Sequence, residues 1–171
     1  MRHLEDVIAQ LTPGGRDVWR YSEWLEIDQR RISGFGHITN DPDPLHIDPD
    51  YAREFGPYGV TIAFGFLTVS LLTFFHHQAT PPVASGYALN YGFDRLRLTS
   101  TVKVGARVRG AFRLIDAQDR GAGRLLLRYE TRVEVEGDDK PALVAEWLVM
   151  WIDDGRERPA DLALATATAE A

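Results

Sequence analysis

The sequence contains no cysteine among its 171 residues. This absence excludes disulfides, thiolate nucleophiles and cysteine-based metal sites, and it is typical of proteins from reducing compartments. Positive charge is also in deficit, because 19 Lys and Arg residues stand against 25 Asp and Glu residues, for a formal net charge of −6. The chain therefore lacks the basic stripe that phosphate backbones require, which argues against a nucleic-acid partner. We expect a cytoplasmic protein.

Long apolar runs are missing as well. Residues 1–6 include Glu5 and Asp6, where a signal peptide would have a continuous apolar core. Only residues 60–75 resemble a membrane span, but this run is shorter than the roughly twenty apolar residues needed to cross a bilayer. It also contains several hydroxyl side chains. We therefore expect neither export nor membrane insertion, and a helix buried inside a globular fold.

The composition is sufficient for one hydrophobic core. Hydrophobic residues make up 44% of the chain, with four Trp and eight Phe, as is typical of an ordinary globular protein. We expect residues 1–152 to form a single domain. Residues 153–171 are rich in Ala and Thr and contain few large apolar side chains, which predicts a flexible tail.

The spacing of apolar residues changes at Pro81-Pro82. Before it, helical spacing predicts short helices over residues 4–11 and 28–38, another capped by Asp48, and the apolar run of residues 61–75. After it, apolar residues alternate with polar ones, which predicts antiparallel strands at 87–98, 107–115, 124–136 and 143–152. A helix that is apolar nearly all round needs cover on most sides, and a curved sheet wrapped about it provides that cover. The predicted class is α+β.

Residues 41–50 read Asp-Pro-Asp-Pro-Leu-His-Ile-Asp-Pro-Asp and contain the candidate catalytic side chains. Asp41 and His46 place a carboxylate and an imidazole on one turn whose backbone is restricted by prolines. Such a pair is suited to taking a proton from water near neutral pH. The alternative reading is a capped, solvated loop without catalytic function.

Metal binding is not expected from these residues. A calcium loop would need an oxygen ligand where Leu45 follows Asp41 and Asp43, together with a glycine turn and a terminal glutamate. His76 and His77 are adjacent, so on a helix their side chains point in different directions.

Residues 40–49, Asn-Asp-Pro-Asp-Pro-Leu-His-Ile-Asp-Pro, resemble the motif Gly-Asp-x-Asn-Pro-Leu-His-x-Asp-Pro of the MaoC-like dehydratases. This family includes R-specific enoyl-CoA hydratases, and the resemblance is greatest to its nodulation protein N-like branch. It extends through residues 63–68, 90–97, 102–105 and 140–146, and so covers roughly residues 20 to 152. The resemblance implies the hotdog fold, a central helix wrapped by an antiparallel sheet, in agreement with the class predicted from periodicity.

By this resemblance the catalytic residues fall on Asp41 and His46. Gly65, near the start of the central helix, would offer its backbone N–H to the oxygen of a thioester, since the first amides of a helix have no partner within it. A glycine in an apolar helix is otherwise a packing contact. The chain departs from the family at Asn40, where a Gly is usual, and at Phe64, where a His precedes the helix glycine. Phe64 is thus a possible substrate-site residue.

Further site residues follow from the same resemblance. Thr73 lies where some R-specific hydratases have a Ser, although a Thr hydroxyl commonly bonds back to its own helix. Arg97 and Lys103, in a cluster with Arg95 and Arg107, are possible contacts for CoA phosphates. The same basic residues are equally consistent with a solvated face.

The resemblance implies (R)-specific hydration of trans-2-enoyl-CoA to 3-hydroxyacyl-CoA, or the reverse dehydration, in fatty acid metabolism. It implies no cofactor, and the open edge of a hotdog sheet suggests a homodimer. One alternative is an acyl-CoA thioesterase of the same fold, which typically has an acidic residue on the central helix; residues 61–75 contain none. A second alternative is a non-catalytic subunit that binds an acyl-CoA or a partner, for which Phe64 is the best argument.

Overall fold

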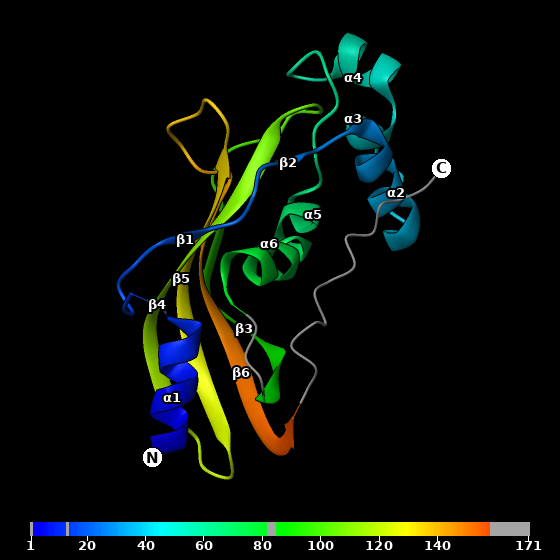
Figure 1. Cartoon of the computed structure of the whole chain (residues 1–171). Helices are drawn as coiled ribbons and strands as arrows, with labels where there is room; N and C mark the ends of the chain where they lie inside the picture. Colours follow the sequence, from blue (N-terminus) through cyan, green and yellow to red (C-terminus); the bar gives the residue numbers. More distant parts are fainter. Residues whose placement is uncertain (1, 13, 82–84, 158–171) are drawn as a thin grey trace.

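The computed structural model describes residues 2–12, 14–81 and 85–157. A long, curved sheet curls around a central pair of short helices, α5 and α6 (Figure 1). In chain order the elements are α1 (Arg2–Leu11), β1 (Arg20–Tyr21), β2 (Leu25–Glu26), α2 (Gln29–Thr39), α3 (Pro44–Ile47), α4 (Pro49–Phe55), α5 (Gly65–Ser70), α6 (Leu72–Ala79), β3 (Ser85–Leu98), β4 (Arg107–Asp119), β5 (Arg124–Val135) and β6 (Leu143–Glu157). The predicted α+β class is confirmed.

The sheet is antiparallel throughout, in the order β1-β4-β5-β6-β3, with β2 also beside β4. Strand β5 shows why the alternating pattern predicted it. Its side chains at Leu125, Leu127, Tyr129 and Val133 are at most 2% exposed and belong to the core. Those between them include arginines and glutamates paired across the outer face, such as Arg128 with Glu146 at 3.0 Å. One face of the sheet is therefore packed on the helices and the other is wet.

The central helix starts later than the apolar run suggests. Residues 61–63 are extended, since the Ala63 N–H donates to the Val102 carbonyl at 2.8 Å and Ile62 forms a bridge with Lys103. The helix begins at Gly65, pauses at Leu71 and continues to residue 79. The expected start at residue 61 was wrong because these backbone groups bond to a segment about forty residues away in the chain, a partner that local periodicity does not reveal.

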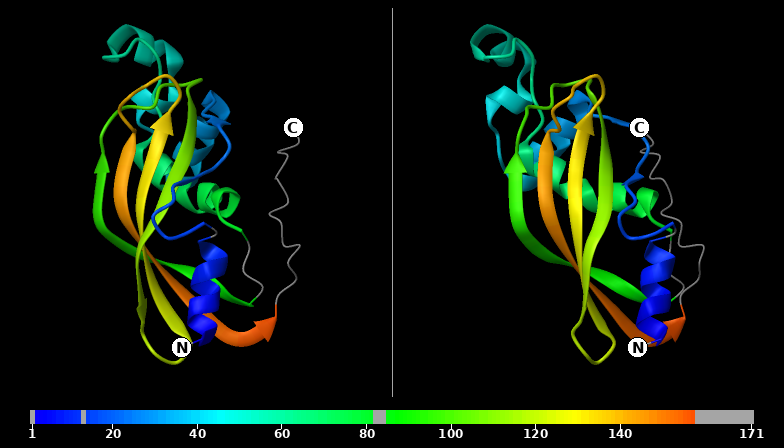
Figure 2. Two further views of the ribbon diagram at one scale, coloured as in Figure 1. Left: turned by 60° about the vertical axis from the view of Figure 1, so that its left-hand side comes forward. Right: turned by 90° about the vertical axis from the view of Figure 1, so that its left-hand side faces the viewer.

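Helices α2, α3 and α4 form an overhang at one end of the sheet, and α1 lies near the other end (Figure 2). The overhang is shaped by carboxylates at its helix starts. Asp28 accepts from the Arg31 N–H at 2.7 Å, and Asp48 accepts from the N–H groups of Asp50 and Tyr51 at 3.0 Å. The Asp48 N-cap agrees with the sequence prediction, and both caps satisfy amides that have no acceptor within the helix.

Strand β6 runs to Glu157, so the domain boundary expected at residue 152 falls inside a strand. The rest of the expected tail, residues 158–171, lies outside the described residues. In the described part of the chain, none of the helices combines the length and apolar character required to span a bilayer.

Candidate active site

The turn that carries Asp41 depends on a left-handed residue. Asn40 ends α2 with φ 55° and ψ 36°, a region that glycine adopts most easily and asparagine more readily than most other residues. Asn40 in place of the motif's Gly is therefore compatible with the same turn. The next amide, that of Asp41, donates to the Gly36 carbonyl at 2.9 Å. The Asp41 side chain is exposed, and its Oδ1 accepts a long bond of 3.3 Å from the Asp43 N–H.

His46 lies on α3 and is held by two contacts. Its Nδ1 is 2.7 Å from the Ile62 carbonyl oxygen. Because a carbonyl can only accept, we assign the ring proton to Nδ1, which leaves Nε2 of the neutral ring as a proton acceptor. The Phe64 ring stacks on the imidazole with centroids 3.9 Å apart and an interplanar angle of 30°. The imidazole is therefore constrained both at one edge and on one face.

His46 and Gly65 line the same cavity, of about 310 Å³. Gly65 is the first residue of α5, and the preceding Phe64 supplies no side-chain hydrogen bond to the helix start. The amides there have no acceptor within the helix. A Cβ at Gly65 would collide with Leu98, whose side chain also lines the cavity. The arrangement places a proton acceptor and a backbone donor around one cavity.

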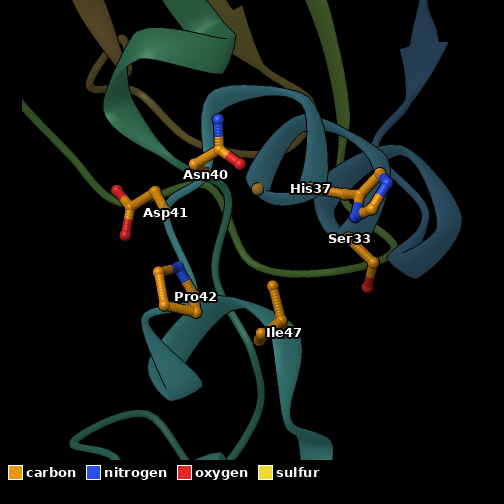
Figure 3. A pocket seen from close by; sticks show the side chains of 7 residues that line it. Ser33, His37, Asn40, Asp41, Pro42 and Ile47 are labelled. Atoms are coloured by element: carbon orange, nitrogen blue, oxygen red, sulfur yellow. The ribbon is translucent and has the colours of Figure 1, made fainter.

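Asp41 lines a neighbouring, more open hollow of about 490 Å³. Figure 3 shows Asp41, Asn40 and Pro42 on one side of it and Ser33 and His37 on the other. Within the described part of the chain, no ion pair within 4.0 Å joins Asp41 to His46. The structure thus brings His46 and Gly65 together, and the joint action of Asp41 with His46 stays a prediction.

Thr73 does not line the cavity with His46. Its hydroxyl accepts a hydrogen bond of 3.4 Å from the Asn90 side chain on β3. Thr68 does line the cavity and is 5% exposed. It stands three residues after Gly65, so both lie on one face of α5. That spacing was the signal by which sequence reasoning could have found it.

The four basic residues predicted near CoA divide into two pairs. Arg95 and Arg107 each lie within salt-bridge distance of a glutamate, at 3.8 and 2.9 Å. No such carboxylate partner is found for Arg97 or Lys103 among the described residues. The Lys103 ammonium lies 5.9 Å from the centre of the Tyr58 ring. These two cations remain available to an anionic ligand.

Sequence reasoning missed Gln29. Its Nε2 donates to the His46 carbonyl at 2.8 Å and to the Ser33 hydroxyl at 3.0 Å, while its Oε1 accepts from the Thr61 hydroxyl. One amide thereby ties α2 and α3 to the segment that leads into α5. A glutamine in the first turn of a helix resembles any surface residue in the sequence, so no local signal marked it.

The strongest pKa shifts occur in the core, away from this cavity. Burial, followed by the charges of His77 and Arg20, lowers the pKa of His76 to about 3. Burial likewise raises the pKa of Tyr129, whose ring meets that of His76 edge-on at 4.8 Å. No group of three His, Asp or Glu residues in the described ranges is arranged to hold a metal ion.

Comparison with known proteins places the chain in a family. Residues 15–136 match the family described as "MaoC like domain". Nodulation protein N of Rhizobium leguminosarum bv. viciae is 43% identical over 139 residues, which are 81% of this chain and 86% of that protein. The 3-hydroxyacyl-thioester dehydratase Z of Mycobacterium tuberculosis is 38% identical over 152 residues, 89% of this chain and 99% of that protein.

Solved structures agree on the fold. The unliganded R-hydratase PhaJ1 from Pseudomonas aeruginosa superposes with a TM-score of 0.67 at 21% identity, over 82% of this chain and 83% of that one. At this identity the likeness concerns the fold alone, which is the hotdog fold. Taken with the sequence matches, it shows that the chain belongs to the MaoC-like dehydratase family.

Proposed function

We propose that the protein is an (R)-specific hydratase that adds water to a trans-2-enoyl-CoA, or removes it from the 3-hydroxyacyl-CoA. The observation that carries this proposal is the shared cavity of His46 and Gly65. A proton acceptor and a backbone donor are the two groups that hydration of an unsaturated thioester demands. The mycobacterial relative, a 3-hydroxyacyl-thioester dehydratase, supports the same reaction class.

The proposed chemistry assigns one task to each group. The Gly65 N–H donates to the thioester oxygen and stabilises the negative charge that develops there as the enolate forms; loss of one such donor typically costs about a hundredfold or more in rate. In hydration an O–H bond of the water breaks as its oxygen bonds to the β-carbon, and His46 Nε2 takes that proton, since Nδ1 is engaged by Ile62. The same proton is then delivered to the α-carbon, which leaves the imidazole neutral again; dehydration runs these steps in reverse.

Asp41 is proposed to hold the same water from the other side. Its carboxylate is exposed and retained by one long bond to the Asp43 amide. A change of side-chain rotamer toward His46 therefore breaks little existing structure. Two acceptors on one water would fix its oxygen opposite the β-carbon.

The test is a spectrophotometric hydration assay on trans-2-enoyl-CoA esters of graded chain length. We expect turnover by the natural protein, and a loss of several orders of magnitude in Asp41→Asn and in His46→Ala. Asp50→Asn is the matched control, because Asp50 is exposed on α4 and its one ion pair among the described residues is with Arg53. Unchanged turnover in both Asp41→Asn and His46→Ala would refute the mechanism. Release of free CoA instead would identify a thioesterase.

The CoA end is proposed to lie near Lys103 and Arg97. Thr101 lines the cavity and donates to the Tyr58 hydroxyl at 3.0 Å, and Tyr58 in turn lies beneath the Lys103 ammonium. Phosphates near these residues would meet cations without a carboxylate partner among the described residues, although Arg97 also donates to the Leu96 carbonyl at 2.8 Å. We expect Lys103→Ala and Arg97→Ala to raise KM for the CoA ester but not for the corresponding pantetheine ester, which lacks the nucleotide. An equal rise with both esters would contradict the assignment.

A homodimer is proposed through β3. This strand is the edge of the sheet and exposes large apolar side chains, among them Leu89, Tyr91 and Phe93. Phe66 on the adjoining α5 is 74% exposed. An edge of this length and character is a template for pairing with a second copy. Sedimentation equilibrium should give twice the chain mass, and Tyr91→Arg should shift the protein toward the monomer; a monomeric natural protein at micromolar concentration would overturn this.

A further inference from the structure

The Phe64 ring packs on the imidazole of His46 but is not itself among the residues that line the cavity. We propose that Phe64 is a positioning residue for His46, whose imidazole it holds with Nε2 directed into the cavity. This inference rests on the proposed hydratase function and deepens it. It assigns a task to the residue at which the chain departs from the family motif.

A single hydrogen bond leaves the His46 imidazole free to tilt. A histidine side chain has two torsions, and a single hydrogen bond from Nδ1 to Ile62 fixes the position of one edge but permits the ring to tilt about that contact. Phe64 covers one face at 3.9 Å between centroids, with the planes only 30° apart. A flat, near-parallel neighbour removes the tilt that the hydrogen bond leaves. Both contacts are needed to fix the direction of Nε2.

Phe64 is itself held in place by its neighbours. It is 4% exposed, and the Phe35 ring lies against it at 5.4 Å between centroids. Its far end reaches α2, where a Cβ built at Gly36 would lie 2.9 Å from the Phe64 Cζ. A ring packed this closely cannot turn away from His46 without displacing α2. It can therefore serve as a fixed reference surface.

A short segment of chain connects the groups that position His46 to the proposed donor at Gly65. Ile62 engages Nδ1, Phe64 covers the imidazole face, and Gly65 carries the proposed oxyanion donor. Residues 62–65 thus set the position of the proton acceptor relative to the donor through three peptide units. The Ala63 N–H bond to Val102 at 2.8 Å anchors this segment.

The competing interpretation is that Phe64 only fills space, in which case any apolar side chain of similar size would serve. Phe64→Leu and Phe64→His separate the two interpretations. Leucine is apolar but has no flat face, whereas histidine keeps a planar ring and is the residue usual in the family. Phe112→Leu is the matched control, because Phe112 is equally buried, at 1% exposed, but contacts His76 and Trp147 in the core.

Steady-state kinetics should separate kcat from KM in these variants. We expect Phe64→Leu to lower kcat by about ten- to a hundredfold with KM changed much less, as for a catalytic group displaced by a fraction of an ångström to about 1 Å. Phe64→His should retain kcat within about threefold of the natural protein. Phe112→Leu should lower the melting temperature and leave kcat unchanged. Equal kcat in Phe64→Leu and the natural protein, or equal losses in both Phe64 variants, would overturn the proposal.

A second measurement does not depend on turnover. Two-bond 1H–15N spectra distinguish histidine tautomers, and the His46→Gln variant identifies the His46 signals by their loss. The natural protein and Phe64→His should each show one Nδ1–H tautomer, and Phe64→Leu should show averaged signals. A natural protein without hydratase activity would refute the proposed function alone. An unchanged His46 spectrum in Phe64→Leu would refute the positioning inference alone.

Discussion

Two glycines on the same helix offer a direct test of how the Asp41 turn is packed. A Cβ at Gly36 would lie 2.9 Å from the Asp41 carbonyl oxygen, 2.9 Å from the Phe64 Cζ and 3.1 Å from the Ile47 Cγ2. A Cβ at Gly34, two residues earlier on α2, would meet nothing within 4 Å. Gly36→Ala and Gly34→Ala therefore make the same chemical change in one helix with opposite surroundings.

The expected magnitudes follow from that contrast. Alanine stabilises a helix interior by roughly 0.5–1 kcal/mol relative to glycine, so Gly34→Ala should stabilise the protein by about that amount. At Gly36 the new methyl meets a backbone oxygen and a buried ring, neither of which is a flexible end, and overpacking of this kind costs about 1–3 kcal/mol. After the helical gain is subtracted, Gly36→Ala should be destabilised by about 1–2 kcal/mol.

Urea denaturation and thermal melting measure this difference. With about 2–4 °C per kcal/mol for a chain of this size, the two variants should melt roughly 3–12 °C apart. Gly36→Ala should also lower hydratase turnover, because Asp41 and Phe64 must shift, while Gly34→Ala should not. Equal melting temperatures, or equal turnover in the two variants, would refute the described packing of α2 against the turn.

Three further outcomes are expected. The pKa of His76 is about 3 in the folded protein and near 6.5 in the unfolded chain, so its contribution to stability is complete above pH 6.5 and is lost as the pH falls toward 3. The free energy of unfolding measured in urea should be lower at pH 5 than at pH 7 by at most about 2 kcal/mol, and His76→Gln should remove this difference. Gly65→Ala should lower turnover with little change in melting temperature, since the new methyl displaces only the half-exposed Leu98 side chain; a large drop in melting temperature would contradict this. Gln29→Glu removes the donor to the His46 carbonyl and should cost about 1–3 kcal/mol in urea unfolding, whereas an unchanged midpoint would show that the bond contributes nothing.

The sheet could be predicted from the sequence because each long strand carries its own evidence. Alternation along β5 needs no knowledge of distant residues, and the caps at Asp28 and Asp48 are likewise local. The start of the central helix could not be predicted in this way. Local periodicity does not separate residues 61–63 from the helix that follows, and they are held extended by backbone bonds to a distant segment, such as that from Ala63 to Val102.

The candidate site was likewise predictable from local sequence patterns only in part. The motif pointed to Asp41, His46 and Gly65 through fixed spacing in the chain. It implied that all three would face one site, but not that Asp41 would line a different hollow from that of His46 and Gly65. The approach of the Phe64 ring to α2 is likewise a contact between segments nearly thirty residues apart, which no local pattern reveals. The bridging role of Gln29 is non-local in the same sense.

The order of strands in the sheet has a consequence for synthesis on the ribosome. Strand β3 is made before β4, β5 and β6, yet within the sheet it pairs only with β6, the last of them. Until β6 has emerged, both edges of a fourteen-residue strand with several exposed aromatic side chains are unpaired. Nascent chains are thus open to misassociation while residues 99–157 are being made, so slower elongation through this stretch should increase the demand for chaperones.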